Sequence, residues 1–294
     1  MPRAKANEIE IEYETFGDPA ARPLLLIAGL GAQMITWHEA FCSQLAERGF
    51  HVIRFDNRDA GLSTRMVDAG YPDLAAALSG NPQPAYQLDD LADDAVSLLE
   101  ALGIGAAHIV GASMGGYIAQ VVAINYPDHV LSLTSIMSGP AWMEAVPATP
   151  EAAATLMVKP ASTREERIEQ AMANRRVLLG SGDPFDESFE RPRAERAFDR
   201  AYYPVGVGRQ FVAIRAAKGR LERLKQVRVP TLVIHGVDDV LVPVENGRLV
   251  ADAVPGARLV EIDGMGHDLP KRVWPQVLDA IDEIAHQAAP LQRR

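Results

Sequence analysis

The segment Gly111–Gly115 places Ser113 among small residues, in the pattern Gly-Ala-Ser-Met-Gly. It follows the apolar run 106–111, which predicts a strand, and precedes residues 114–127, which predict a helix. A G-x-S-x-G pattern at a strand-to-helix junction forms a sharp turn that exposes the serine hydroxyl, and the glycines let the backbones approach closely. Ser113 is therefore a candidate nucleophile. The alternative is a helix N-cap serine beside packing glycines, which the five residues alone do not exclude.

A serine hydroxyl is a poor nucleophile at neutral pH, so this chemistry needs a histidine as base and an acid that orients it. His267 is the best-placed histidine, because it lies in a loop after the last predicted strand. The other six histidines fall on predicted helices or within or beside predicted strands. The acid should follow the preceding strand, where Asp238 and Asp239 stand side by side. The residues alone leave both open.

The elements that would position these groups alternate along the chain. Apolar or alternating runs predict strands in the following segments: 9–17, 23–32, 50–63 with its polar turn, 106–111, 130–139, 229–243 and 257–262. Helical patterns lie between most of them. This alternation predicts an α/β fold with a mostly parallel sheet and helices on both faces, in which ligands bind beyond the carboxyl ends of the strands. Residues 9–17 are predicted to be the edge strand of an antiparallel hairpin.

The composition and pattern change between residues 140 and 226, where strand-like runs are missing and Arg, Glu and Pro are frequent. We therefore expect two parts. Residues 1–139 and 227–294 are predicted to form the α/β core. Residues 140–226 are predicted to form an inserted helical cap over the site.

Composition narrows the classes of partner. The net charge is −10 and Cys42 is the single cysteine, so neither nucleic acid, an anionic membrane nor a disulfide framework is expected. The N-terminus lacks the apolar region of a signal peptide, and no apolar run approaches the length of a membrane span. We expect a cytoplasmic protein with a small-molecule partner. A homodimer remains open.

Five motifs occur in one order along the chain: AGLG at 28–31, DNRDAGLS at 56–63, GASMG at 111–115, HGVDDVLVP at 235–243 and GMGH at 264–267. Together they resemble the α/β-hydrolase superfamily over nearly the whole chain. The resemblance implies the order Ser113, Asp, His267, and selects Asp239 as the acid, with Asp238 capping the loop. It also implies an oxyanion hole from the backbone N–H groups of Met114 and Leu30. The family often has His-Gly-x-Gly at the second position, so the missing histidine removes a side chain that commonly braces this loop.

Other candidates have ordinary structural readings. Asp56, Arg58 and Asp59 could be catalytic or could clamp a substrate, but the resemblance favours a structural turn that braces the loops near the oxyanion hole. Trp37, Trp142 and Met143 are predicted to line a substrate pocket, although such residues more often simply pack.

Members of this superfamily that displace halide or open epoxides have aspartate at the turn. With serine at position 113, the resemblance therefore implies acyl transfer. The resemblance implies a serine carboxylesterase that uses an acyl-enzyme and no metal or organic cofactor. The chain is similar to a bacterial branch that includes methylesterases acting on polyketide antibiotics, such as aclacinomycin methylesterase. Cofactor-independent haloperoxidases or perhydrolases and carbon–carbon bond hydrolases use the same triad and remain alternatives. A ligand-binding module with slow turnover is an alternative of another class.

Overall fold

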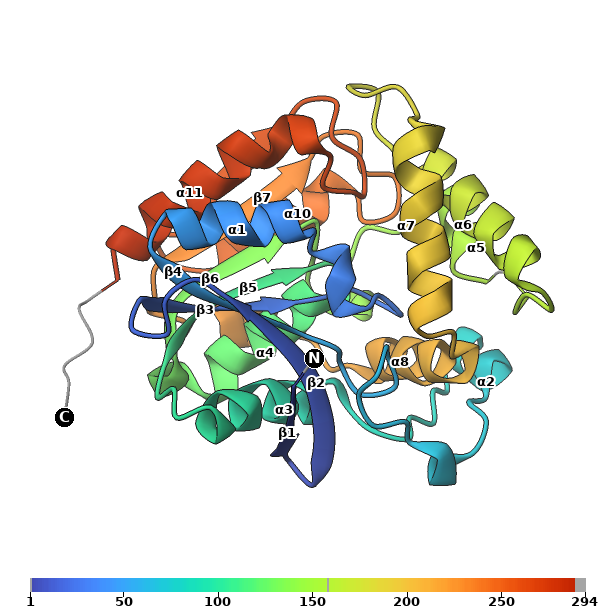
Figure 1. The fold of residues 1–294 in the computed structure, drawn as a ribbon, viewed down its shortest axis with the longest axis horizontal. Helices are drawn as coiled ribbons and strands as arrows, with labels where there is room; N and C mark the ends of the chain where they lie inside the picture. Colours follow the sequence, from blue (N-terminus) through green and yellow to red (C-terminus); the bar gives the residue numbers. More distant parts are fainter. Residues whose placement is uncertain (1, 158, 289–294) are drawn as a thin grey trace.

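The computed structural model describes residues 2–157 and 159–288, which form one eight-stranded sheet with helices on both faces (Figure 1). The strand order is β1-β2-β4-β3-β5-β6-β7-β8, and every pair from β4 to β8 is parallel. The predicted α/β class is confirmed. Residue 1 and residues 289–294, the ends of the predicted core, lie outside the described residues.

The strands are β1 (Arg3–Ala6), β2 (Ile9–Phe16), β3 (Arg22–Ile27), β4 (Phe50–Phe55), β5 (Ala107–Ala112), β6 (Val130–Ile136), β7 (Thr231–Gly236) and β8 (Arg258–Ile262). The central strands are buried because helices cover both faces, which explains their continuous apolar runs. The prediction that residues 9–17 form an edge strand is wrong. β2 lies between β1 and β4, since the short polar segment Arg3–Ala6 pairs with it and becomes the edge.

The α-helices are α1 (Glu39–Glu47), α2 (Leu74–Leu78), α3 (Leu88–Ala101), α4 (Met114–Asn125), α5 (Pro150–Thr155), α6 (Arg164–Leu178), α7 (Glu187–Arg200), α8 (Pro204–Ala216), α9 (Leu221–Leu224), α10 (Val244–Ala253) and α11 (Trp274–His286). Short 3₁₀ turns lie at Met34–Thr36, Val67–Ala69, Pro127–His129, Trp142–Glu144 and Lys271–Val273. None of the helices in the described part of the chain is long and apolar enough to cross a bilayer.

The core has two layers, one on each face of the sheet. Side chains of α3, α4 and α10 pack with one face, and side chains of α1 and α11 pack with the other. Helix α4 follows the strand that carries the candidate nucleophile and is buried along nearly its whole length. The turn between β5 and α4 is therefore held between the sheet and its helical layer, and this rigid setting fixes where Ser113 can lie.

Helices α5 to α9 occupy the segment between β6 and β7, where no strand occurs among the described residues. Helices α6 and α7 pack against each other at one end of the sheet, and α7 leads toward α8 (Figure 1). This arrangement places a helical segment where the sequence predicts an insertion. The assignment of residues 140–226 as a separate cap stays a prediction.

Strand β5 contains a buried histidine, His108, near the end of the strand that lies away from Ser113. Its ring is 3% exposed, and its Nδ1 lies 2.8 Å from Ser132 Oγ on β6. Burial lowers the pKa of His108 from 6.5 to about 4, because the imidazolium would lose its hydration. Acid therefore favours the unfolded chain, in which this histidine titrates normally. The free energy of unfolding is therefore unaffected by this group above about pH 6.5, and it decreases as the pH falls from there toward 4.

We expect His108→Gln to flatten the pH dependence of unfolding in this range. One proton taken up on unfolding changes the free energy by about 1.4 kcal/mol per pH unit. Urea unfolding of both proteins between pH 7 and pH 4 measures the difference between their profiles. Parallel profiles would show that His108 is not the group responsible.

Candidate active site

The turn that carries Ser113 has an unusual backbone. Ser113 has φ 56° and ψ −121°, a backbone conformation with positive φ that residues other than glycine rarely adopt. Its N–H donates to Ile136 O at 2.9 Å, and its carbonyl accepts from Ser138 Oγ at 2.8 Å. These bonds to β6 and to the loop after it hold the strained residue in place. Such strain persists where the surroundings fix it, and it is typical of functional sites.

Two glycines make this turn possible. A Cβ on Gly111 would collide with the carbonyl oxygen of Gly115, and a Cβ on Gly115 would collide with that of Ile27 on β3. Helix α4 thus begins pressed against β5 and β3. The small residues that flank the serine in the sequence are required by this close approach, whatever chemistry follows.

His267 lies between the serine and an acid. Its Nε2 is 3.0 Å from Ser113 Oγ, and its Nδ1 is 2.7 Å from Asp239 Oδ2. An ionised carboxylate only accepts hydrogen bonds, so Nδ1 carries the proton and Nε2 is left to accept from the serine hydroxyl. The backbone N–H of His267 donates to Leu178 O at the end of α6, at 2.8 Å. This bond fixes the histidine loop against the end of α6.

Asp239 is held as an ionised acceptor in the loop after β7. It is 4% exposed, and its Oδ1 accepts from the N–H groups of Leu241 at 2.9 Å and Val242 at 2.8 Å. Burial alone would raise the pKa of Asp239, but the neighbouring His267 and a hydrogen bond from His235 outweigh it and lower the pKa. The neighbour Asp238 lies elsewhere, since its Oδ2 accepts from Ser181 N–H at 2.8 Å. The structure brings Asp239, rather than Asp238, to the histidine.

Sequence reasoning missed His235, which it placed in a strand and set aside. His235 is the second-last residue of β7 and has no exposed surface, and its Nε2 lies 2.7 Å from Val242 O and 3.5 Å from Asp239 Oδ2. It therefore supports the loop of the acid from behind. The signal in the sequence was its position four residues before Asp239, which places both side chains at the end of one strand.

Leu30 and Met114 line the same cavity as Ser113. Met114 is the first residue of α4, so its N–H has no acceptor within the helix, and Leu30 N–H has none among residues 2–157 and 159–288. A Cβ added to Gly29 would lie 3.2 Å from Ser113 Cβ, which shows how closely this loop approaches the nucleophile. Two free N–H groups near the serine are the donors that an oxyanion requires.

A glutamine from α8 braces the same loop. Gln210 Oε1 accepts from Gly31 N–H at 2.8 Å, and Gln210 Nε2 donates to Arg58 O at 2.8 Å. The side chain is fully buried. Gln210 thus ties the loop to the turn after β4, in the role that the absent histidine of the His-Gly-x-Gly pattern would fill. Nothing in the sequence near Gly31 indicates this partner, because it lies 179 residues away.

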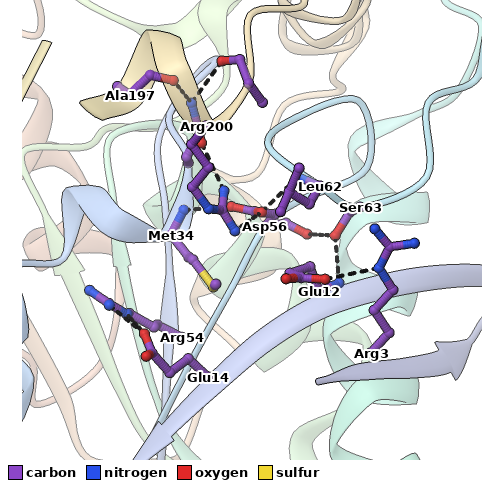
Figure 2. Close-up of polar contacts among 12 residues, drawn as sticks. Arg3, Glu12, Glu14, Met34, Arg54, Asp56, Leu62, Ser63, Ala197 and Arg200 are labelled. Atoms are coloured by element: carbon purple, nitrogen blue, oxygen red, sulfur yellow. Dashed lines mark hydrogen bonds and ion pairs between the residues drawn. The ribbon is translucent and has the colours of Figure 1, made fainter. Parts of the chain in front are cut away.

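The DNRDAGLS turn is a structural brace, as Figure 2 shows for Asp56. Its two carboxylate oxygens accept from the N–H groups of Met34 at 2.7 Å and Leu62 at 2.9 Å. Arg200 at the end of α7 adds an ion pair at 2.7 Å. The buried Asp56 therefore joins the segment after the Leu30 loop to the end of α7.

These groups open into a cavity of about 820 Å³. Ser113, His267, Trp37 and Trp142 line it, together with many apolar side chains of the core and of α5 to α8. Met143 does not line it and is 84% exposed, because the short Trp142–Glu144 turn directs only the first of its residues inward. No three His, Cys, Asp or Glu side chains of the described residues come together as a metal ion would require.

Residues 22–270 match the alpha/beta hydrolase fold family. The chain belongs to this family. It is 33% identical to rhodomycin D methylesterase DauP of Streptomyces sp. (strain C5), over 96% of each chain. It is 29% identical to a putative carbamate hydrolase, RutD of Azorhizobium caulinodans, over 91% of each chain. In structure it resembles the enol-lactonase of Burkholderia xenovorans LB400, with a TM-score of 0.75 and 22% identity over 97% of this chain and 100% of the other.

The two adjacent aspartates make a matched pair for mutation within this hydrolase fold. We expect Asp239→Asn to lower kcat by about 10⁴-fold, because an amide no longer holds the imidazole in the tautomer with a free Nε2. Asp238→Asn should change kcat little. Steady-state kinetics with an activated ester, checked by thermal unfolding of both variants, measures this. A reversed order of severity would overturn the assignment of the acid.

Gln210 offers a second prediction. Gln210→Ala should lower kcat by up to about 10²-fold, since one misplaced oxyanion donor costs that much, with a smaller change in KM. Gln210→Glu keeps the acceptor for Gly31 N–H and should retain more activity. Equal losses in the two variants would mean that the acceptor is not what matters.

Proposed function

We propose that this chain is a carboxylic ester hydrolase in which Ser113 is the nucleophile, His267 the base and Asp239 the acid that orients it. One observation carries the proposal: the three side chains form a continuous hydrogen-bonded chain at the wall of a large, mostly apolar cavity. The similarity to a rhodomycin D methylesterase over 96% of the chain supports an ester as substrate.

The reaction would run in two halves. Ser113 Oγ attacks the ester carbonyl while His267 Nε2 accepts its proton, and the carbonyl oxygen gains negative charge beside the N–H groups of Leu30 and Met114. His267 then protonates the departing alcohol, which leaves an acyl group on the serine. Water, deprotonated by the same nitrogen, releases the acid and restores the hydroxyl. No step needs a metal or an organic cofactor.

The helices between β6 and β7 would act as a cap that sets which esters enter. Side chains of residues 140–226 supply much of the lining of the cavity that Ser113 also lines, and they would contact the acyl part of the substrate. A volume of about 820 Å³ suits a small to medium-sized ester. The methylesterase relatives favour a small alcohol such as methanol.

Three alternative functions are compatible with the same geometry, and they differ in the co-substrate, substrate or turnover that an assay would detect. Perhydrolase chemistry would need peroxide, and carbon–carbon bond hydrolysis would act on a β-diketone. A ligand-binding module would show a single slow turnover with retained product. A cytoplasmic location and a homodimer remain predictions from the sequence.

Removing the nucleophile is the direct test. We expect Ser113→Ala to lower ester hydrolysis by at least about 10⁴-fold and to abolish covalent labelling by an organophosphonate. A panel of methyl and p-nitrophenyl esters measures the first effect, and intact-protein mass spectrometry measures the second. Thermal unfolding checks that the variant folds.

Two results would contradict the proposal. Labelling that persists in Ser113→Ala would place the reactive group elsewhere. Turnover of the β-diketone without turnover of any ester would favour carbon–carbon bond hydrolysis.

A further inference from the structure

Helix α6 turns a polar face toward the cavity. The face has helical spacing and consists of Arg167, Gln170, Asn174 and Arg175. Three of the four side chains are anchored by the protein. Gln170 donates to Lys159 O at 3.0 Å, and Asn174 donates to Thr155 O at 3.2 Å.

Arg175 is anchored by acids instead. It lies 3.3 Å from Glu190 on α7 and 3.5 Å from Asp268. The remaining arginines of α6 that do not line the cavity are also paired, Arg164 with Asp199 at 2.7 Å and Arg176 with Glu187 at 3.3 Å. Acidic side chains are thus provided for each of these cations.

Arg167 is different. Within residues 2–157 and 159–288 no carboxylate pairs with it, and its recorded neighbour is Tyr202, whose ring centre lies 5.8 Å from the guanidinium carbon. No acid stands three or four residues away on the helix, where Thr163, Arg164, Gln170 and Ala171 occur. Burial lowers the pKa of Arg167, but a guanidinium remains protonated in proteins.

An unpaired, partly buried cation costs free energy, and proteins usually pair such a charge. This chain carries 39 acidic residues against 29 Lys and Arg, so the lack of an acid beside Arg167 does not reflect a shortage of acidic residues. Instead the guanidinium faces a mostly apolar cavity. An anion that entered the cavity would meet a cation already stripped of part of its water, which strengthens their attraction.

We propose that Arg167 binds a carboxylate of the substrate, so that the enzyme favours esters whose acyl part carries a second, ionised carboxyl group. This inference rests on the proposed ester hydrolysis at Ser113. The planar guanidinium presents two parallel N–H groups to a carboxylate. Tyr202 Oη accepts from Ala161 N–H at 2.8 Å, so its own proton is free to donate beside the same anion.

The remaining lining makes the preference selective. Asp59 and Asp268, the lining acids, each face an arginine, Asp59 at 2.9 Å from Arg209. Lys159 also lines the cavity, and no acid pairs with it among the described residues, although it is exposed whereas Arg167 is partly buried. The uncompensated charge of the cavity is therefore positive, although the chain as a whole is acidic. Without this positive charge, a carboxylate that left water for an apolar pocket would lose hydration free energy with nothing to offset the loss.

Matched substrates test the proposal. The carboxylate series consists of mono-p-nitrophenyl esters of dicarboxylic acids from succinate to sebacate, and each neutral counterpart ends the same chain in a methyl group. For the best carboxylate substrate, Arg167→Gln should lower kcat/KM by about tenfold to a hundredfold, the loss of a charge-assisted hydrogen bond. The neutral counterpart should be unaffected. Arg167→Lys should retain part of the preference, because it keeps the charge but loses the planar fork.

Arg164→Gln is the control. It removes an arginine from the same helix that pairs with Asp199 and does not line the cavity, so both substrate series should be unaffected. Equal losses in both series for Arg167→Gln would indicate a structural role and overturn the proposal. The same holds if Arg167→Gln leaves the carboxylate series unchanged.

Binding without turnover separates this inference from the proposed function. Ser113→Ala, titrated calorimetrically with the monomethyl ester of each diacid from succinate to sebacate, should bind at least one of them, and adding Arg167→Gln should weaken that binding by about tenfold or more. If the native protein hydrolyses no ester but this difference persists, ester hydrolysis fails and the anion site stands. If neutral esters are hydrolysed and the difference is missing, the anion site fails alone.

Discussion

One imidazole must contact two groups that are far apart in the chain. His267 meets Ser113, 154 residues earlier, and Asp239, 28 residues earlier, and each contact uses a different ring nitrogen. The three residues follow β5, β7 and β8, whose carboxyl ends meet at one edge of a parallel sheet. A shift of one strand register would move a side chain by about 3.3 Å and break one of these contacts. The register of the sheet is therefore a condition for the chemistry.

The loops that carry the acid and the histidine are fitted to each other through their backbones. Asp238 N–H donates to Met265 O at 3.0 Å, and a Cβ on Gly236 would collide with the same carbonyl. The helices between β6 and β7 join this arrangement at three points, through Leu178 O, Gln210 and Arg200. A segment whose side chains line the cavity thus also holds the histidine loop, the Leu30 loop and the turn after β4. A change in its packing would therefore alter both the cavity wall and the positions of these loops.

The sequence was most informative where function depends on local backbone. The glycines around Ser113 and the loop before His267 follow strands closely, so spacing alone could locate them and predict the order of the elements. The pattern could not reveal Gln210, because its partner Gly31 is distant in the chain and the contact depends on how α8 packs. Arg167 was hidden for another reason. The sequence of α6 is rich in charged residues, which is typical of a helix exposed to solvent. Only the contacts with α7 show which of its arginines lacks an acidic partner.

A second buried carboxylate, Asp268, follows His267 directly in the chain, and its surroundings differ from those of Asp239. Asp239 accepts two backbone N–H groups and a histidine proton, so it is stabilised as an anion despite its burial. Asp268 is equally buried at 3% exposure, but neither of its oxygens accepts a hydrogen bond within the described residues, and burial raises its pKa although Arg175 opposes the effect. Hydrogen bonding to the ionised form, rather than proximity to the ring, decides which acid can stabilise an imidazolium. Of the two acids, Asp239 is thus the one whose surroundings favour the ionised form, and it is the one that accepts a hydrogen bond from His267 Nδ1.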